Sequence, residues 1–325
     1  MSNTKNCRNM YGGPLAEIIT EYILHKRATG YAYIREARDF RAFDNFTKMF
    51  DFPKVVLPKH VVLDWTEKRP YEKPNNHIKR FNAMRRFGEF MGMRGYDAYV
   101  PARMPKQSMD PYRPYIFSED EVARMLTVAD GYQSSTFSPN LKRIIPVAFR
   151  ILYGCGLRSS ELTNLKIQDV DLENCRFTIR ESKFRKERIV PMAASLARFC
   201  SDYMSTVNKG CCPNDYFLRN PGNRRYGYQG TYYWFRELLY RAGIPHGGKG
   251  KGPRLHDLRH TFSVHCLKRW TLRGKDIRSM LPVLSAYMGH CDLQGTQIDE
   301  KAGIYTNRKL DVFTCDIDTD THRES

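Results

Sequence analysis

The sequence predicts a mainly α-helical protein of two domains, the second of which carries one small antiparallel β-sheet. Three observations predict this class. The chain has 325 residues, 41% of them hydrophobic, which suits two domains of ordinary size. Apolar residues recur at helical spacing along most of the chain, and a proline-rich stretch at 101–117 divides this pattern in two. Three short runs in the second part have the composition of β-strands.

The first domain is expected at residues 14–100, after a flexible N-terminus at 1–13. Helical spacing of apolar residues predicts helices at 15–30, 40–50 and 77–91. The third of these has a one-sided basic face that consists of Lys79, Arg80, Arg85 and Arg86. A basic face is ordinarily just solvated, but its one-sidedness favours contact with a DNA backbone.

The second domain is expected at residues 118–313 and begins with a capping box, in which Ser118 and Glu121 satisfy the first free amides of a helix. Further helices are predicted at 141–153, 159–165, 193–207, 229–242, 256–270 and 275–288, and strands at 167–172, 176–180 and 188–191. A glycine-rich loop at 247–252 offers Lys249 and Lys251 as additional DNA contacts. The polar tail at 314–325 is interpreted either as disordered or as packed on a neighbouring protomer.

The net charge of +18 indicates a polyanionic partner, and nucleic acid is the usual one. An anionic membrane surface is the alternative, but no basic amphipathic helix with a clean apolar face supports it. No apolar run is long enough for a membrane span, and the polar N-terminus lacks the apolar core of a signal peptide. We therefore expect a cytoplasmic, nucleoid-associated protein with no membrane partner.

The nine cysteines are scattered and form no CxxC pair. This pattern is typical of a reduced protein with free thiols rather than of a disulfide framework. The paired ligands at fixed spacing that a metal site needs are not found either. The sequence therefore predicts no metal and no cofactor.

Four stretches of the second domain together resemble the tyrosine recombinases, the family that includes the phage integrases. They are GCGLRSSEL at 154–162, KFRKERIVP at 183–191, HDLRH at 256–260 and MGH at 288–290, with a tyrosine at 305. Each stretch alone is a weak signal, whereas their joint occurrence in this order is specific. The resemblance covers residues 118–313 and extends more weakly to the N-terminal helices. It implies a helical core-binding domain joined to an α+β catalytic domain.

The resemblance also implies a set of catalytic residues: Arg158, Lys183, His256, Arg259, His290 and Tyr305, with Glu161 in support. The residue types suit the attack of a side-chain hydroxyl on a phosphodiester. Two guanidinium groups can clamp the non-bridging oxygens in planar, bidentate fashion. A tyrosine of pKa ~10 needs help to become a nucleophile, here from His256. A lysine beside two arginines has a lowered pKa that suits proton donation to the leaving oxygen, here from Lys183.

The implied reaction is site-specific recombination through a covalent 3′-phosphotyrosine. Such a bond conserves the energy of the cut phosphodiester, so no ATP is needed. The fixed positive charge of the two arginines does the work that metal ions do in other nucleases, so no metal ion is expected either. The expected partners are double-stranded DNA, further copies of the chain in a tetramer on that DNA, and accessory DNA-bending proteins. The expected role is the integration or excision of a mobile element.

The identity of the nucleophile is the open point of the sequence. In most relatives the tyrosine lies nine residues after the histidine of the stretch that MGH resembles, and that spacing from His290 leads to Asp299. Tyr305 lies six residues further on, in the context Ile304-Tyr305-Thr306-Asn307 that is usual for the nucleophile. One reading is a six-residue insertion in the loop, which costs well under ~1 kcal/mol in closure entropy. The other reading is a site without a nucleophile.

Two other functions remain as alternatives. The first is a catalytically inactive DNA-binding protein that keeps the fold and acts as an accessory factor or repressor. The second is a relaxing enzyme similar to the type IB topoisomerases, which use related chemistry. The separate N-terminal helical domain and the short chain favour recombination over relaxation.

Overall fold

The structure is a computed structural model that describes residues 10–104, 113–180, 187–248 and 252–289. Within these ranges the chain is mainly helical and contains one three-stranded antiparallel sheet, which confirms the predicted fold class. The chain divides into two compact units, Met1–Asp110 and Pro111–Ser325. Each unit has a hydrophobic core of its own.

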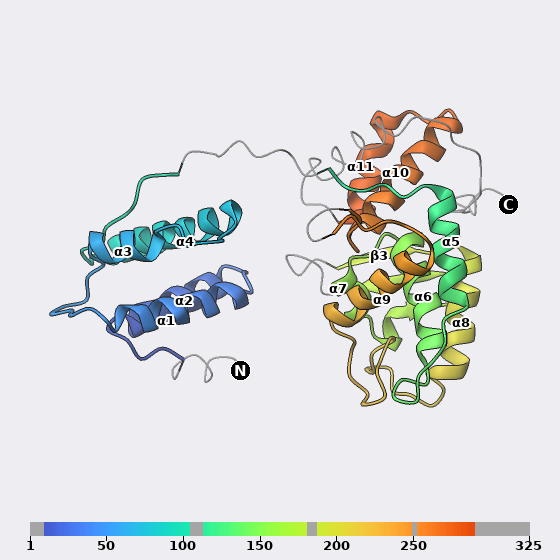
Figure 1. The fold of residues 1–325 in the computed structure, drawn as a ribbon, viewed down its shortest axis with the longest axis horizontal. Helices are drawn as coiled ribbons and strands as arrows, with labels where there is room; N and C mark the ends of the chain where they lie inside the picture. The colour runs from blue at the N-terminus through green and yellow to red at the C-terminus, as the bar shows by residue number, and fades with distance from the viewer. Residues whose placement is uncertain (1–9, 105–112, 181–186, 249–251, 290–325) are drawn as a thin grey trace. The chain divides into compact units, whose positions relative to one another are not determined.

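The first unit consists of helices in two layers, α1 with α2 and α3 with α4 (Figure 1). Their bounds are Ala16–Ala28, Ile34–Thr47, Lys59–Thr66 and Pro74–Met93. The predicted helices correspond to α1, α2 and α4, although the ends differ by several residues. Helix α3 was not predicted, because eight residues are too few to show a helical period.

Aromatic rings fill the space between the two layers. The ring of Tyr22 on α1 meets Phe40 of α2 and Phe87 of α4, each at a centroid distance of 5.4 Å, in edge-to-face geometry. All three side chains are at most 2% exposed. Such pairs contribute about 0.5–1.5 kcal/mol beyond the apolar area that they bury. The phenylalanine spacing of the sequence is thus explained by a shared aromatic core.

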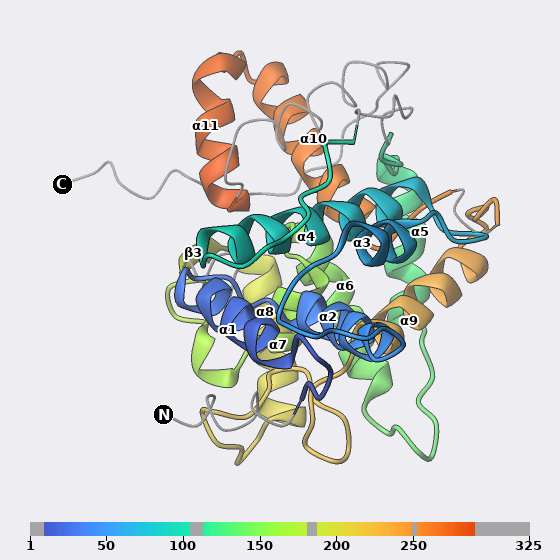
Figure 2. The same cartoon turned by 90° about the vertical axis from the view of Figure 1, so that its left-hand side faces the viewer.

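The second unit is organised around a central helix, α6, which packs against α5, α7, α8 and α10 (Figures 1 and 2). Most of its side chains are buried. Helices α10 and α11 form a hairpin at one end of this unit, with a small core of their own. The helices are α5 (Glu119–Asp130), α6 (Leu141–Gly154), α7 (Ser159–Asn164), α8 (Ala194–Val207), α9 (Tyr228–Arg241), α10 (Asp257–Leu272) and α11 (Ile277–Met288).

The sheet has the order β1-β2-β3, with bounds Val170–Asp171, Arg176–Ile179 and Arg188–Pro191. Both pairings are antiparallel, and Phe177 of β2 lies opposite Val190 of β3. The strand predicted at 167–172 is wrong in its first part, because Ile167–Asp169 is a 3-10 helix. The Asp169 carboxylate accepts a hydrogen bond from the Lys166 amide at 3.2 Å, and such local capping competes with strand formation.

The predicted capping box at the start of α5 is confirmed. Ser118 Oγ accepts from the Glu121 amide at 3.1 Å, and Glu121 Oε2 accepts from the Ser118 amide at 2.8 Å. The preceding residue, Phe117, is fully buried, and its amide donates to Thr261 Oγ1 of α10 at 3.1 Å. Phe117 therefore belongs to the core of the second unit rather than to the linker predicted at 101–117.

No helix in the described ranges is long and apolar enough to cross a bilayer.

Candidate active site

Three arginines from different elements surround one buried carboxylate, that of Glu161. The Glu161 side chain is 1% exposed. Arg158 Nη1 lies 2.6 Å from Glu161 Oε1, and Arg188 Nη1 and Nη2 lie 2.9 and 2.8 Å from Oε1 and Oε2. Arg259 Nη1 lies 3.9 Å from Oε2. We call these four residues the arginine cluster.

The backbone at the start of α7 fixes the pair of Arg158 and Glu161. Arg158 precedes α7, and its amide donates to Glu161 Oε2 at 3.0 Å, so the glutamate caps the helix from its third position. Gly156 adopts a φ of +57°, and a Cβ there would lie 2.5 Å from Phe262 Cδ1. The glycine of the first motif is therefore required both by its left-handed backbone and by its contact with α10.

The same three arginines bind the end of α11. Arg188 Nε donates to Tyr287 O at 2.9 Å, and Arg158 Nη2 donates to Gly289 O at 3.1 Å. Arg259 Nη2 donates to the carbonyl between them, Met288 O. The last carbonyls of a helix carry partial negative charge, which cations stabilise. The cluster is thereby attached to the segment that directly precedes position 290.

The arginines of the cluster differ in exposure. Arg259 is 2% exposed and also donates to Gly156 O at 2.6 Å, so it is part of the interior. Arg188 is 11% exposed, and Arg158 is 20% exposed. Arg158 is thus the member of the cluster that is most accessible to a ligand.

The charge of Glu161 depends on its arginine neighbours. Burial by itself would raise the pKa of this carboxyl. The hydrogen bonds and positive charge of Arg188, together with those of Arg158, outweigh burial and lower the pKa to about 2. Glu161 is therefore ionised at neutral pH, and the cluster is a permanent array of charges.

The histidines of the second domain have different environments. His256 occupies the N-cap position of α10, one turn before Arg259, and is exposed. Its ring meets that of His260 edge-on, at a centroid distance of 5.0 Å. His265 is buried, its Nδ1 lies 2.9 Å from the Tyr153 hydroxyl, and burial lowers its pKa to about 4. His265 therefore has a packing role.

Tyr287 lies beside the cluster but has a packing role. Its hydroxyl donates to Pro191 O at 3.1 Å, and its ring stacks on Phe262. Burial raises its pKa well above the ordinary value. A phenol that resists ionisation and is already hydrogen-bonded to a carbonyl is poorly suited to nucleophilic attack.

Comparison with known proteins identifies the family. The sequence model of the phage integrase family matches residues 116–299, which is more than half of the chain. The chain belongs to the phage integrase family. This range contains the whole arginine cluster, and the family is that of the tyrosine recombinases, as the sequence motifs predicted.

Named relatives of this integrase-family chain match it along most of its length. It is 31% identical over 298 residues to a putative integrase/recombinase, y4rE, of Sinorhizobium fredii, with 87% of this chain and 90% of the relative covered. It is 32% identical over 231 residues to the tyrosine recombinase XerA of Thermococcus kodakarensis, with 70% and 71% covered. Among solved structures, the Tn1549 transposon integrase in complex with a circular intermediate DNA has a similar fold, with a TM-score of 0.60. The two sequences are 16% identical, and the comparison covers 87% of this chain and 94% of the other.

Several residues that the family resemblance implied lie outside the described ranges. They are Lys183, His290 and Tyr305 of the catalytic set, the alternative position Asp299, and the loop lysines Lys249 and Lys251. The structure therefore brings together Arg158, Glu161 and Arg259 of the predicted site and places His256 one turn before Arg259.

Arg188 is the site residue that sequence reasoning did not single out. The sequence places it in the predicted strand at 188–191 and in the stretch KFRKERIVP, without a role of its own. A signal was present, because side chains alternate between the two faces of a strand and Arg188 shares its face with the buried Val190. A charged residue on the inward face of a strand requires a partner, and that partner is Glu161.

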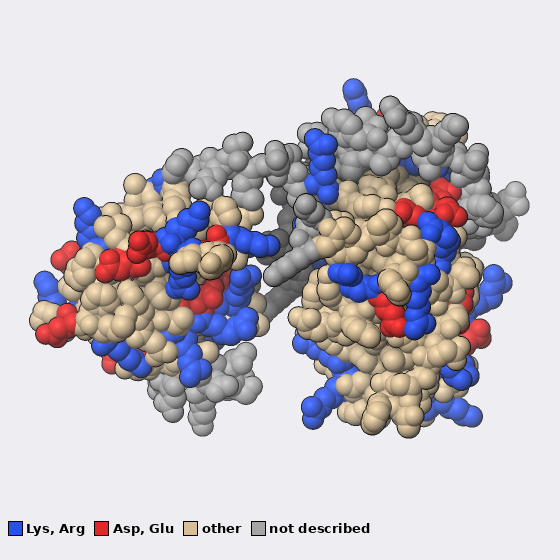
Figure 3. Space-filling view, viewed as in Figure 1, with Lys and Arg blue, Asp and Glu red and all other residues tan. Residues whose placement is uncertain are grey.

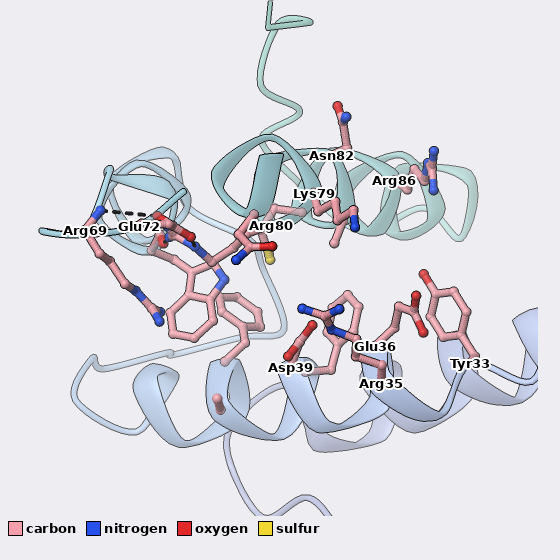
Figure 4. Close-up of a pocket in the computed structure, with 17 residues that line it drawn as sticks. Tyr33, Arg35, Glu36, Asp39, Arg69, Glu72, Lys79, Arg80, Asn82 and Arg86 are labelled. Carbon is pink, nitrogen blue, oxygen red and sulfur yellow. Dashed lines mark hydrogen bonds and ion pairs between the residues drawn. The ribbon is translucent and has the colours of Figure 1, made fainter. Parts of the chain in front are cut away.

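The first unit presents basic side chains on its surface, as does the second (Figure 3). A groove of about 440 Å³ lies between α2 and α4. Figure 4 shows Arg35, Glu36 and Asp39 on α2 facing this groove, with Lys79 and Arg86 on α4. More basic than acidic side chains thus line the groove.

The four basic residues predicted on α4 do not form one uniform face. Lys79 and Arg86 are exposed, and Arg85 forms an ion pair with Glu89 at 2.7 Å. Arg80 is held within the unit, because its guanidinium binds Glu72 at 2.5 Å, Glu67 O at 2.8 Å and the Trp65 carbonyl. Arg80 therefore holds the segment between α3 and α4 in place. The sequence predicts a DNA contact for Arg80, whereas its guanidinium is bound within the first unit.

No group of three or more His, Cys, Asp and Glu side chains that could hold a metal ion occurs in the described part of the chain.

Proposed function

We propose that this integrase-family protein is a site-specific DNA recombinase that cuts and rejoins strands through a 3′-phosphotyrosine intermediate. The arginine cluster carries the proposal. Its three guanidinium groups and one carboxylate leave two net positive charges next to the partly exposed Arg158. A phosphodiester under attack by a hydroxyl gains negative charge in its transition state, and fixed, pre-oriented cations stabilise that charge.

In the proposed reaction Tyr305 Oη attacks the scissile phosphorus while the bond from phosphorus to the 5′-oxygen breaks. Arg158 and Arg259 hold the non-bridging oxygens, and His290 adds a hydrogen bond to the phosphate. His256 assists removal of the phenolic proton, and Lys183 donates a proton to the leaving 5′-oxygen. A 5′-hydroxyl of a second strand then attacks the phosphotyrosine and restores a phosphodiester. The phosphotyrosine bond conserves the energy of the cut phosphodiester, so the cycle requires no ATP. The fixed positive charge of the arginine cluster takes the role that metal ions have in other nucleases.

The proposed partners are double-stranded DNA and further copies of this chain, arranged as a tetramer on the DNA, with accessory DNA-bending proteins. The net charge of +18 supports the first of these. The proposed role is integration or excision of a mobile element in the cytoplasm, at the nucleoid. The similarity to a putative integrase/recombinase and to a transposon integrase supports that role.

A DNA-binding protein without catalysis is the second candidate. The observation that favours it is Asp299, which stands at the spacing from His290 where most relatives have their tyrosine. A carboxylate there would repel the phosphate, and an acyl phosphate would hydrolyse readily. The two candidates differ in covalent adduct formation, because both bind DNA.

The deciding experiment traps the adduct on duplexes that tile the DNA flanking the gene and carry 5′-bridging phosphorothiolates. Cleavage releases a thiolate that does not religate. We expect a covalent band with wild-type protein, none with Tyr305→Phe, and almost none with Arg158→Ala. Tyr240→Phe is the matched control, because this tyrosine is 86% exposed on α9. Adduct formation by Tyr305→Phe would refute the assigned nucleophile, and bound DNA without adduct in every lane would favour the binding-only protein.

A further inference from the structure

Arg188 is part of the arginine cluster but has no task in the proposed reaction. Its guanidinium faces the Glu161 carboxylate in a bidentate pair, with Nη1–Oε1 and Nη2–Oε2 distances of 2.9 and 2.8 Å. The two residues are 27 positions apart, on β3 and α7. Planar, charge-assisted pairs of this kind are among the strongest hydrogen-bonded contacts in proteins.

The remaining nitrogen of Arg188 is engaged as well. Nε donates to Tyr287 O at 2.9 Å. Gly289 packs against the guanidinium so closely that a Cβ there would lie 3.1 Å from Arg188 Nη1. Every nitrogen of this side chain thus has a partner within the protein, and two of the three nitrogens bind Glu161. Arg188 is therefore better placed to hold Glu161 than to contact a substrate.

The charges of the cluster indicate what Arg188 does. A carboxylate with 1% exposure must be neutralised by a neighbour. If Arg158 were the only close partner of Glu161, the positive charge of Arg158 would be neutralised by that carboxylate. Because Arg188 binds both carboxylate oxygens, one cation is matched to the anion, and the charges of Arg158 and Arg259 remain in excess.

We propose that Arg188 is a positioning residue that neutralises Glu161 and so leaves the positive charge of Arg158 for an oxyanion at the site. This inference rests on the proposed function for the identity of that oxyanion, the scissile phosphate. It makes a specific prediction about charge. Loss of Arg188 weakens oxyanion binding, and simultaneous loss of the Glu161 charge restores it.

The chain offers a matched control for this test. Arg176 lies on the neighbouring strand β2 and forms an ion pair with Asp171 at 2.8 Å. Its side chain is 43% exposed, and its partner is not Glu161. Arg176→Gln removes the same charge from the same sheet but leaves the cluster intact.

The test measures the binding of sodium tungstate, a tetrahedral dianion, to the full chain by titration calorimetry. Arg158→Gln defines the part of the binding that belongs to the cluster. We expect Arg188→Gln to weaken that part at least about tenfold, which corresponds to ~1.4 kcal/mol. Arg188→Gln combined with Glu161→Gln should bind within about threefold of wild type, because the net charge of the cluster is then the same as in wild type. Arg176→Gln should bind as wild type does.

Three results would overturn the inference. They are wild-type binding by Arg188→Gln, a double variant that binds no better than Arg188→Gln, and a wild type that binds no better than Arg158→Gln. Circular dichroism checks folding. If Arg188→Gln does not fold, Arg188→Lys replaces it, since lysine keeps the charge without the bidentate geometry. Tungstate binding by Arg188→Lys as weak as that of Arg158→Gln would then contradict the charge argument.

Failure of the proposed function has a different signature. A chain that binds tungstate in the predicted pattern but forms no covalent adduct with DNA is not a recombinase, and the role of Arg188 stands. A chain that forms the adduct in wild type and equally fast in Arg188→Gln is a recombinase in which Arg188 has no positioning role.

Discussion

At the scale of single residues, Glu161 and His265 are two groups whose protonation the fold shifts in the same direction. Arg188 and Arg158 lower the pKa of Glu161 to about 2 from 4.5, against the effect of burial. Burial lowers the pKa of His265 to about 4 from 6.5. In both cases the unfolded chain binds the proton more tightly. Each group therefore contributes stability that is present above its unfolded pKa and is lost as the pH falls through its folded pKa.

We predict that the free energy of unfolding falls on acidification in two windows, from pH 6.5 to about 4 for His265 and from pH 4.5 to about 2 for Glu161. Glu161→Gln should reduce the second fall, to which Glu72 and Asp171 also contribute because their carboxyl pKa values are lowered as well. It should also lower stability at neutral pH by about 3 kcal/mol, because it leaves arginines without their buried partner. Urea unfolding at a series of pH values measures the acid profile of the free energy of unfolding and its value at neutral pH. Asp171→Asn should keep most of the second fall, because solvent screens this surface ion pair although it also lowers the pKa of Asp171. An acid profile of Glu161→Gln that equals that of wild type would exclude this assignment.

Gly289 shows how one residue couples backbone geometry to the cluster. Its φ of +64° lies in the left-handed region, and it packs against Arg188. Gly274 has a similar φ of +69°, but nothing lies within 4 Å of the place where its Cβ would be.

We predict that Gly289→Ala destabilises the protein more than Gly274→Ala does. Both substitutions carry the cost of a left-handed alanine, about 1–2 kcal/mol, but only the former displaces Arg188 from Glu161. Denaturant melts measure the difference, and adduct formation should fall for Gly289→Ala alone. Equal losses in the two variants would show that the close packing at Gly289 is unimportant.

At the scale of elements, the capping box of α5 fixes where the first helix of the second unit begins. Glu121 serves two contacts, because its Oε2 caps the helix while its Oε1 accepts from the Tyr115 hydroxyl at 2.5 Å. Helix α5 is joined to α10 by an ion pair between Glu119 and Lys268 at 3.1 Å. The start of α5 is therefore fixed relative to α10, the helix that carries Arg259.

We predict that Ser118→Ala lowers the free energy of unfolding by about 1 kcal/mol, the usual cost of a lost N-cap. Ser201→Ala, at an exposed position within α8, is the control and should be neutral or slightly stabilising, because alanine is the better helix former. Thermal melts of the two variants provide the comparison. A loss in the control as large as that in Ser118→Ala would mean that the cap has no special contribution.

At the scale of the whole molecule, a net charge of +18 dominates encounter with DNA. Phosphate contacts release counterions, so the logarithm of the binding constant should fall steeply and linearly with the logarithm of the salt concentration. Exposed cations that contact phosphate contribute to this slope, whereas cations held within the fold do not.

We predict that Lys79→Ala and Arg86→Ala each reduce the magnitude of the salt slope by about one unit. Arg80→Ala should instead destabilise the first unit, because its guanidinium binds Glu72 and two backbone carbonyls. Fluorescence anisotropy with a labelled duplex at several salt concentrations gives the slopes. Arg94→Ala, which removes a cation paired with Glu21 at 2.7 Å, serves as the comparison. Unchanged slopes for Lys79→Ala and Arg86→Ala would move the DNA contact away from α4.

The sequence by itself determined the class of fold, the capping box at Ser118 and most helices. These features depend on neighbours within a few residues, where helical spacing and capping act. Only the tertiary structure decided that Arg188 of β3 meets Glu161 of α7, that Arg80 is held inside its unit, and that residues 167–169 form a 3-10 helix. Each of these depends on a partner supplied by the fold or on a polar group that competes with the local pattern, and hydrophobic periodicity carries no information about either.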